Sequence, residues 1–485
     1  MTKKRYFLLG FFSFLFLFVE AQNLRTIKNS AELYFTHAKY KEALYYYSKY
    51  NKTQKNDLDV VLKIGYCLYE TNDLTQAKRF LNYYVENEKK PVARAYLFLG
   101  KINHGENNFK AASLAYKKYI GLVKDSDPDR VWAKEAVRRC GVGIKALALD
   151  QLAFVENLGE NVNTEYDDFN PILSPNYTDK IYFSSTRMGS VGGPRNVKGL
   201  KDEKFGQYSA DMYSSRIVNG EWTATAPFNN LLNSARHEMV LGFNSNGSVM
   251  FYFKGKDLNS GEILVDTFKA NVEDRTLFSS PFRGPMNGEF GDHSPYFFND
   301  TTLIFSSRRA DGFGGYDLYI SVKSNGQWTS PENLGAEINS PFDEISPFLT
   351  KDGRNLYFSS NNRKSIGGMD IFKTKFDENK LTWSTPINLG IPINSSEDDL
   401  YFKLATDGLK AYFSSSRKVG FGNSDIYVAY FKSFQKEQES YSNPLTFRDV
   451  KLAKQLAKET DLSVTEEVTE GLALFSESEI VEYKF

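Results

Sequence analysis

Two different spacings of hydrophobic residues divide the chain near residue 150. Before this point, apolar and small side chains recur every three to four positions, which is the period of amphipathic helices. After it, short aromatic runs are separated by turns rich in Gly, Asp and Asn, which is the pattern of β-strands. The first pattern predicts a helical domain over residues 22–148, and the second predicts a β domain over residues 149–432.

The helical part contains an internal repeat. Three segments superpose without gaps, with alanines 34 and then 35 residues apart: residues 40–50, 74–84 and 109–119, with Ala43, Ala77 and Ala112. A helix before each segment carries a small residue where two helices must approach closely: Ala31, Gly65 and Gly100. This period and pattern resemble the tetratricopeptide repeat.

A helical array of this kind buries its core by stacking neighbouring pairs, and a terminal helix must close it. Residues 131–147 are expected to form that closing helix. The resemblance implies a groove lined by the first helix of each pair. The candidate partner-binding residues in this groove are Tyr34, Tyr66 and Asn103.

The β part repeats one aromatic strand, usually Tyr-Phe-Ser-Ser. Its aligned aromatic residues are separated by 69, 53, 53 and 55 residues: Phe183, Tyr252, Phe305, Phe358 and Phe413. About 53 residues with four short strands are typical of one propeller blade, and closing the ring removes exposed sheet edges. The sequence therefore predicts an α plus all-β protein, with an α-solenoid followed by a five-bladed β-propeller.

The way in which the ring closes is also indicated. Residues 157–171 match residues 333–347 with identical spacing although no blade precedes them, and the last copy lacks its Gly-x-Trp strand. We expect the outer strand of the last blade to come from residues 154–159. The alternative is six blades, with a degenerate blade within residues 433–485, which otherwise read as a C-terminal helix and an acidic tail.

The β repeats resemble the WD40-like propeller repeats of the TolB type, through the Asp-Gly turn, the Tyr-Phe-Ser-Ser strand and the Gly-Gly-x-Asp-Ile-Tyr hairpin. The second copy departs from this pattern, because Phe253 and Lys254 replace the two serines.

The N-terminus has the features of a secretory signal peptide over residues 1–21. Three basic residues precede a 13-residue apolar run, and Val19 to Ala21 resembles a cleavage site. A short uncleaved anchor is the alternative. No Cys follows the apolar run, so no bacterial lipid anchor is expected.

Charge is balanced overall but unevenly distributed. The chain has 60 Lys and Arg against 60 Asp and Glu. Residues 23–150 carry 23 basic and 14 acidic residues, a net charge of +9, whereas residues 151–485 carry 34 and 45, a net charge of −11. We expect the basic domain to bind an acidic or helical peptide, although solvated surfaces can differ in charge without any such role.

Candidate chemistry is confined to residues that repeat from blade to blade. One aspartate per hairpin is expected to cap backbone N–H groups or to pair with a repeated arginine. The expected structural pairs are Asp317 with Arg308, Asp370 with Arg363, and Asp425 with Arg417.

Catalytic and cofactor signals are weak. Four His and two Cys show no metal-ligand spacing, no Gly-x-Ser-x-Gly motif is present, and the glycine-rich loops lack the lysine of a phosphate-binding loop. We predict no cofactor, no metal and no catalytic residue. The alternative is a glycan-binding or glycoside-active propeller with carboxylates in its funnel: Asp343, Glu344, Asp398 and Asp399.

The order of signal peptide, tetratricopeptide array and TolB-type propeller is similar to envelope proteins of Gram-negative bacteria, including PorE-like proteins of type IX secretion and gliding. This resemblance implies a periplasmic, non-enzymatic adaptor that binds an outer-membrane or periplasmic protein complex and no nucleic acid. Membrane association would be peripheral, through partners. An OmpA-like domain, which such relatives often carry, is not recognised in this sequence.

Overall fold

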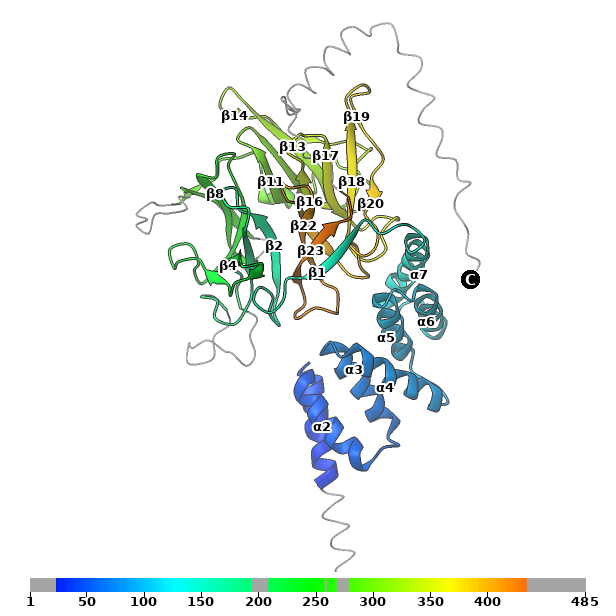
Figure 1. Cartoon of the computed structure of the whole chain (residues 1–485). Coiled ribbons are helices and arrows are strands. Elements are labelled where there is room, and N and C mark those ends of the chain that lie inside the picture. Colours follow the sequence, from blue (N-terminus) through cyan, green and yellow to red (C-terminus); the bar gives the residue numbers. More distant parts are fainter. Residues whose placement is uncertain (1–22, 194–207, 258–259, 268–278, 434–485) are drawn as a thin grey trace, which may run out of the picture.

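The structure is a computed structural model that describes residues 23–193, 208–257, 260–267 and 279–433 (Figure 1). The predicted signal peptide lies outside the described residues, and so does the predicted C-terminal segment apart from residue 433. Among the described helices, none is long and apolar enough to cross a membrane.

Seven described helices form the N-terminal domain, as the spacing of small residues predicts. A helix over residues 23–36 is followed by α2 (Tyr40–Thr53), α3 (Leu58–Glu70), α4 (Leu74–Asn87), α5 (Ala93–Gly105), α6 (Phe109–Leu122) and α7 (Asp129–Ala146). A Cβ atom at Gly65 would lie 2.9 Å from the Leu81 side chain, and one at Gly100 would lie 2.4 Å from the Tyr116 ring. Larger residues at these positions would separate the paired helices. The α7 helix closes the array, burying Cys140 against its neighbours.

The second domain is a ring of five antiparallel sheets. The first contains β2 (Asp168–Leu173), β3 (Lys180–Ser185), β4 (Asp211–Val218), β5 (Glu221–Trp222) and β6 (Ala226–Pro227). The second contains β7 (His237–Phe243), β8 (Val249–Asp257), β9 (Ser260–Thr267) and β10 (Ser280–Pro281). The short helix η1 (Gly288–Phe290) precedes the third, which contains β11 (His293–Asn299), β12 (Thr302–Ser307), β13 (Asp317–Ser324), β14 (Gln327–Trp328) and β15 (Glu332–Asn333).

The fourth sheet contains β16 (Glu344–Leu349), β17 (Asn355–Ser360), β18 (Asp370–Asp377), β19 (Thr382–Trp383) and β20 (Ile387–Asn388). The fifth contains β21 (Asp399–Leu404), β22 (Lys410–Ser415), β23 (Asp425–Phe431) and β1 (Ala153–Asn157). The first strand of each sheet packs against the first strand of the next, so that β2, β7, β11, β16 and β21 are the innermost strands. Five blades are thus confirmed among the described residues.

The ring closes as the sequence predicts. Strand β1 pairs with β23 in antiparallel register, from Ala153 opposite Phe431 to Asn157 opposite Tyr427. The side chain of Asn157 donates to Asp425 over 2.8 Å, which joins the two ends further. The first strand of the domain therefore completes the last blade.

Candidate partner-binding face

The helical domain packs against one face of the propeller. Ile366, in the β17–β18 connection, and Ile391, before β21, belong to the hydrophobic cluster of α5, α6 and α7. At the end of α5, the His104 Nε2 atom lies 2.9 Å from the carbonyl oxygen of Ile366. Because a carbonyl can only accept, this contact places the imidazole proton on Nε2. Burial lowers the pKa of His104 to about 4, so the ring is neutral at pH 7.

Polar contacts extend this junction in both directions. The Arg138 guanidinium of α7 donates to the carbonyl oxygen of Arg363, in the same connection as Ile366. At the other end of the array, Lys41 of α2 lies 2.7 Å from Glu165, in the connection between β1 and β2. The helices therefore lie along this face of the propeller, from the fourth blade to the first (Figure 1).

Charged and aromatic side chains lie between these two ends. The Lys418 ammonium, in the β22–β23 connection, is 5.3 Å from the ring centroid of Tyr69 in α3. Burial raises the pKa of Glu397 to about 7, and the neighbouring Lys101 of α5 and Lys418 oppose this shift. The junction thus combines an apolar core with an acidic group whose charged form two cations favour.

The predicted groove residues do not form one open site. Tyr34 is half-buried and stacks on Tyr46, with ring centroids 5.5 Å apart. Tyr66 is half-buried against Phe98, with centroids 4.7 Å apart. Asn103 is only 7% exposed, and its amide donates to the carbonyl oxygen of Leu99 in its own helix over 2.7 Å. Whether Tyr34 and Tyr66 contact a partner stays a prediction.

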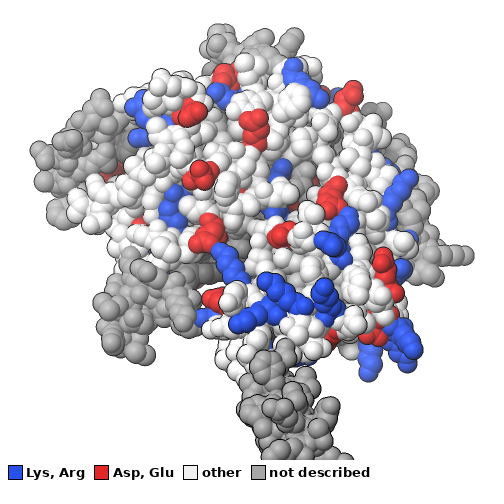
Figure 2. All heavy atoms as spheres, turned by 60° about the horizontal axis from the view of Figure 1, so that its bottom comes forward, with Lys and Arg blue, Asp and Glu red and all other residues white. Residues whose placement is uncertain are grey.

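Many bases of the helical domain are already paired with acids of neighbouring helices. Lys63 lies 2.8 Å from Glu32, and Lys28 lies 2.7 Å from Asp57. In contrast, α2 and its flank carry three exposed lysines that no ion pair engages within the described residues: Lys49, Lys52 and Lys55. Figure 2, which brings the bottom of Figure 1 forward, shows basic side chains gathered on the lower part of this view. The excess positive charge is therefore concentrated in part of the domain.

The repeated aspartates cap backbone N–H groups, which confirms one of the two expectations for them. Asp370 is fully buried and accepts from the N–H groups of Ile366 and Gly367 over 2.7 and 2.9 Å, and from the Asn388 amide over 2.6 Å. Asp317 and Asp425 make the same set of contacts in their own blades. Each aspartate thus holds a glycine-rich connection against the end of its sheet.

The expected Asp–Arg pairs are corrected by the structure. Arg417 binds Asp399 over 2.9 Å rather than Asp425. Arg308 stacks on the ring of Tyr316, with its Cζ atom 3.9 Å from the centroid, and Arg363 is exposed. Backbone N–H groups already surround the hairpin aspartates, so the arginine turns towards a different carboxylate.

The carboxylate that the arginine reaches is the first residue of the innermost strand or the residue just before it. Three blades share this pair: Arg187 with Asp168 over 2.5 Å, Arg309 with Asp292 over 2.5 Å, and Arg417 with Asp399 over 2.9 Å. In all three the arginine follows the last serine of the second strand by two positions. If the arginine had been chosen by its distance from this serine, the sequence would have predicted Arg309 in place of Arg308 for the third blade.

The predicted funnel carboxylates are engaged in the same framework. Asp343 accepts from the Tyr316 N–H over 2.9 Å, and Asp398 accepts from the N–H of Met369 over 2.8 Å. Glu344 is fully buried, where it accepts from Ser340 and Ser360, and burial raises its pKa to about 7. With Asp399 bound to its arginine, all four carboxylates hold connections or strand ends in place. Among the described residues, no group of three or more His, Cys, Asp and Glu is placed to hold a metal ion.

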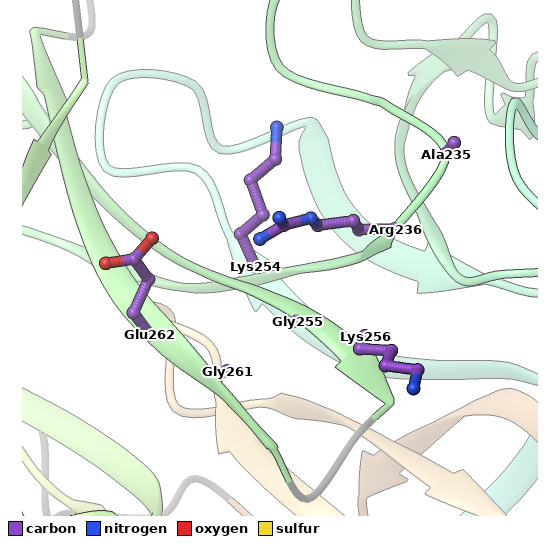
Figure 3. Close-up of a pocket in the computed structure, with 7 residues that line it drawn as sticks. All are labelled: Ala235, Arg236, Lys254, Gly255, Lys256, Gly261 and Glu262. Carbon is purple, nitrogen blue, oxygen red and sulfur yellow. The ribbon is translucent and has the colours of Figure 1, made fainter.

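One cavity of about 360 Å³ opens at the end of the second blade (Figure 3). It is lined by Ala235, Arg236, Lys254, Gly255, Lys256, Gly261 and Glu262. Figure 3 shows Arg236 extending from the connection before β7 towards Lys254 of β8, while Glu262 projects from β9. The sequence did not predict this cavity. One signal was present, because Lys254 stands where the other blades have the second serine of the Tyr-Phe-Ser-Ser strand.

No family model matches the chain, and no curated protein matches it. Among solved structures, it is similar to a putative TolB from Agrobacterium tumefaciens, at 13% identity over 59% of this chain and 100% of that one, with a TM-score of 0.28. The RRP9 WD40 repeats match at 8% identity over 58% and 99% of the two chains, with a TM-score of 0.30. An α-L-arabinofuranosidase from Lactobacillus brevis matches at 14% identity over 44% and 73%, with a TM-score of 0.26. The assignment of the fold rests on the sheets described above.

Proposed function

We propose that the protein is a non-enzymatic adaptor of the bacterial periplasm that binds protein partners and docks to an outer-membrane complex of the type IX secretion or gliding machinery. The observation that carries this proposal is the junction between two repeat scaffolds. Repeat arrays bind partners through extended surfaces. An apolar junction at Ile366 and Ile391 keeps two such surfaces in one orientation, which suits an adaptor better than two freely linked domains.

The cellular location is supported by sequence features. The basic and apolar N-terminal run is typical of an exported protein. The order of repeats resembles that of periplasmic envelope proteins. Peripheral attachment through protein partners is part of the same proposal.

The contacts of the four funnel carboxylates argue against the glycoside-active alternative, because none of them is left as a candidate acid or base. A glycosidase needs two carboxyl groups that face each other across a substrate pocket, with one free to donate a proton. Here Asp343 and Asp398 accept from backbone N–H groups, and Glu344 and Asp399 are fully buried with partners of their own. Such contacts favour a structural role.

Affinity purification of the tagged full-length protein from solubilised envelopes tests the proposal. We expect an integral outer-membrane protein to be recovered in near-equal amount. The matched variants are Ile366→Ser, which opens the junction, and Ile387→Ser, an isoleucine of β20 that is 60% exposed. Recovery should fall with the first and persist with the second. A protein that is free and monomeric in every extract would contradict the proposal.

A further inference from the structure

The second blade differs from three of the others in the connection between its two central strands. The β12–β13, β17–β18 and β22–β23 connections each have nine residues: 308–316, 361–369 and 416–424. The β8–β9 connection comprises residues 258 and 259 alone, and the two strands extend further as a ribbon that ends with Asp257 opposite Ser260. The second blade therefore lacks the glycine-rich segment.

In the other blades this segment covers a carboxylate. Asp370 stands opposite Ser360 in the strand register, and the N–H groups of Ile366 and Gly367 fold back onto it. The equivalent register pair in the second blade is Lys254 opposite Glu262. The β8–β9 connection is too short to fold over this pair as the nine-residue segments do, and the cavity opens at this position.

Two glycines lie in the wall of the cavity, where the two strands approach closely. Gly255 and Gly261 stand opposite each other in the ribbon, and a Cβ atom at Gly261 would lie 2.6 Å from the Gly255 Cα atom. Neither residue carries a side chain that could fill the space. At about 360 Å³, the volume lies within the range of about 300–1,000 Å³ that is usual for ligand sites.

The charge of the cavity is positive. Lys254 lies 3.4 Å from the buried Glu238, which offsets its charge. Arg236 and Lys256 are exposed, and within the described residues no ion pair engages either side chain. Only Glu262 adds a negative charge to the lining. An anionic ligand can therefore bind two cations without first breaking an existing pair.

We propose that this cavity is a docking site for an acidic peptide segment of a protein partner, with a carboxylate between Arg236 and Lys256. The inference deepens the proposed function, on which it rests, by naming a site and the chemistry of the partner. In three other blades a backbone segment occupies the equivalent position, so a peptide fits the space by shape. The basic lining replaces the N–H donors of those segments and selects an acidic sequence.

The charges of two chain segments outside the described residues help to identify the occupant. Residues 194–207, which follow Gly193 in the first blade, contain four bases and two acids, so their charge does not complement the cavity. Residues 461–482 are acid-rich, and they are the competing occupant that the experiment must distinguish.

Fluorescence anisotropy with a labelled short peptide of alternating Gly and Glu tests the proposal on the full-length protein. The variant with Arg236→Glu and Lys256→Glu should lose at least about tenfold in affinity. The control carries Lys351→Glu and Lys364→Glu, two exposed lysines outside the cavity, and has the same net charge. A matched peptide of Gly and Gln should bind neither protein.

Three results would overturn the inference. Equal losses in both variants would mean that net charge alone attracts the peptide, and no measurable binding to the unchanged protein would mean that the cavity takes no acidic segment. If a chain that ends at Ser433 bound the peptide more tightly than the full chain, the cavity would be a site for the protein's own acid-rich residues 461–482. The full-length protein could still recover an envelope partner after any of these results. The proposed function would then hold, and the partner would bind at a different surface of the protein.

Discussion

Lys403 is a buried lysine in the interior of the propeller. It stands on the innermost strand β21 with only 8% of its surface exposed, and its ammonium lies 5.2 Å from the ring centroid of Tyr296 on β11 and 5.6 Å from that of Phe348 on β16. No carboxylate of the described residues is within ion-pair distance of it. Burial lowers the pKa of Lys403 to about 7.

Replacing this lysine should stabilise the fold. Between pH 7 and about pH 10.5 the unfolded chain binds a proton that folded Lys403 does not, so the free energy of unfolding rises with pH in this window. Lys403→Met should raise the free energy of unfolding at pH 7 by about 1–3 kcal/mol and flatten this rise. Urea unfolding at pH 7 and pH 9 measures both effects, with Lys364→Met as the exposed control. A destabilised variant would show that the ammonium has a favourable partner.

The sequence identified the repeated charged residues but not all of their partners. Asp317, Asp370 and Asp425 recur in one hairpin position, and a hairpin carboxylate beside glycines is a natural acceptor for backbone N–H groups. Which carboxylate an arginine binds depends on the direction in which the arginine side chain points at the end of its strand. A shift of one position, from Arg309 to Arg308, is enough to select the wrong residue.

At the scale of elements, the glycine-rich connections are the parts that decide how the two domains meet. The connection of the fourth blade carries Ile366 to the helices, and Asp370 holds it by two backbone hydrogen bonds. The connection of the third blade is held in the same way by Asp317 but has no described contact with the helices.

These two aspartates allow a matched comparison. Asp317→Ala and Asp370→Ala should each lower the free energy of unfolding by about 1–3 kcal/mol, because two N–H groups lose their acceptor. Only Asp370→Ala should also disturb the helical domain, which the NMR signals of the His104 ring report. Equal changes of the His104 signals in both variants would contradict a local role of the connection.

The spacing of aromatic residues predicted five blades because each blade buries the same ring in the same strand. The match between residues 157–171 and 333–347 predicted the closing strand β1 because both segments pair with a central strand in the same register. The second blade shows the limit of such reasoning. Its β8–β9 connection is shorter than those of three other blades, and the cavity there depends on how the two strands continue beyond the usual blade length.

For the whole molecule, the junction between helices and propeller could not be predicted from the sequence. Periodicity reports the contacts that repeat, whereas His104 and Ile366 meet only once, across 262 residues of chain. The predicted groove residue Asn103 is buried for a reason that belongs to its own helix. The two domains must be placed in space before their contacts can be named.

Acid should weaken the junction through His104. Between pH 6.5 and about pH 4 the unfolded chain binds a proton that the folded imidazole does not, so the free energy of unfolding falls as the pH falls. His104→Gln keeps an N–H donor for the Ile366 carbonyl group and cannot titrate. Across this window the wild-type protein should lose roughly 2–3 kcal/mol more than the variant. Parallel pH profiles of the two proteins would contradict a buried neutral ring.

Site-specific photo-cross-linking in living cells tests the central claim, that the protein binds partners through the face shared by the helices and the propeller. A photoreactive residue replaces the exposed Ala235 beside the cavity on this face, or Lys351 in the β16–β17 turn at the opposite end of its blade. We expect the first position to yield a covalent adduct with one defined outer-membrane protein, identified by mass spectrometry, and the second to yield none. Adducts at neither position, or the same adducts at both, would contradict this claim.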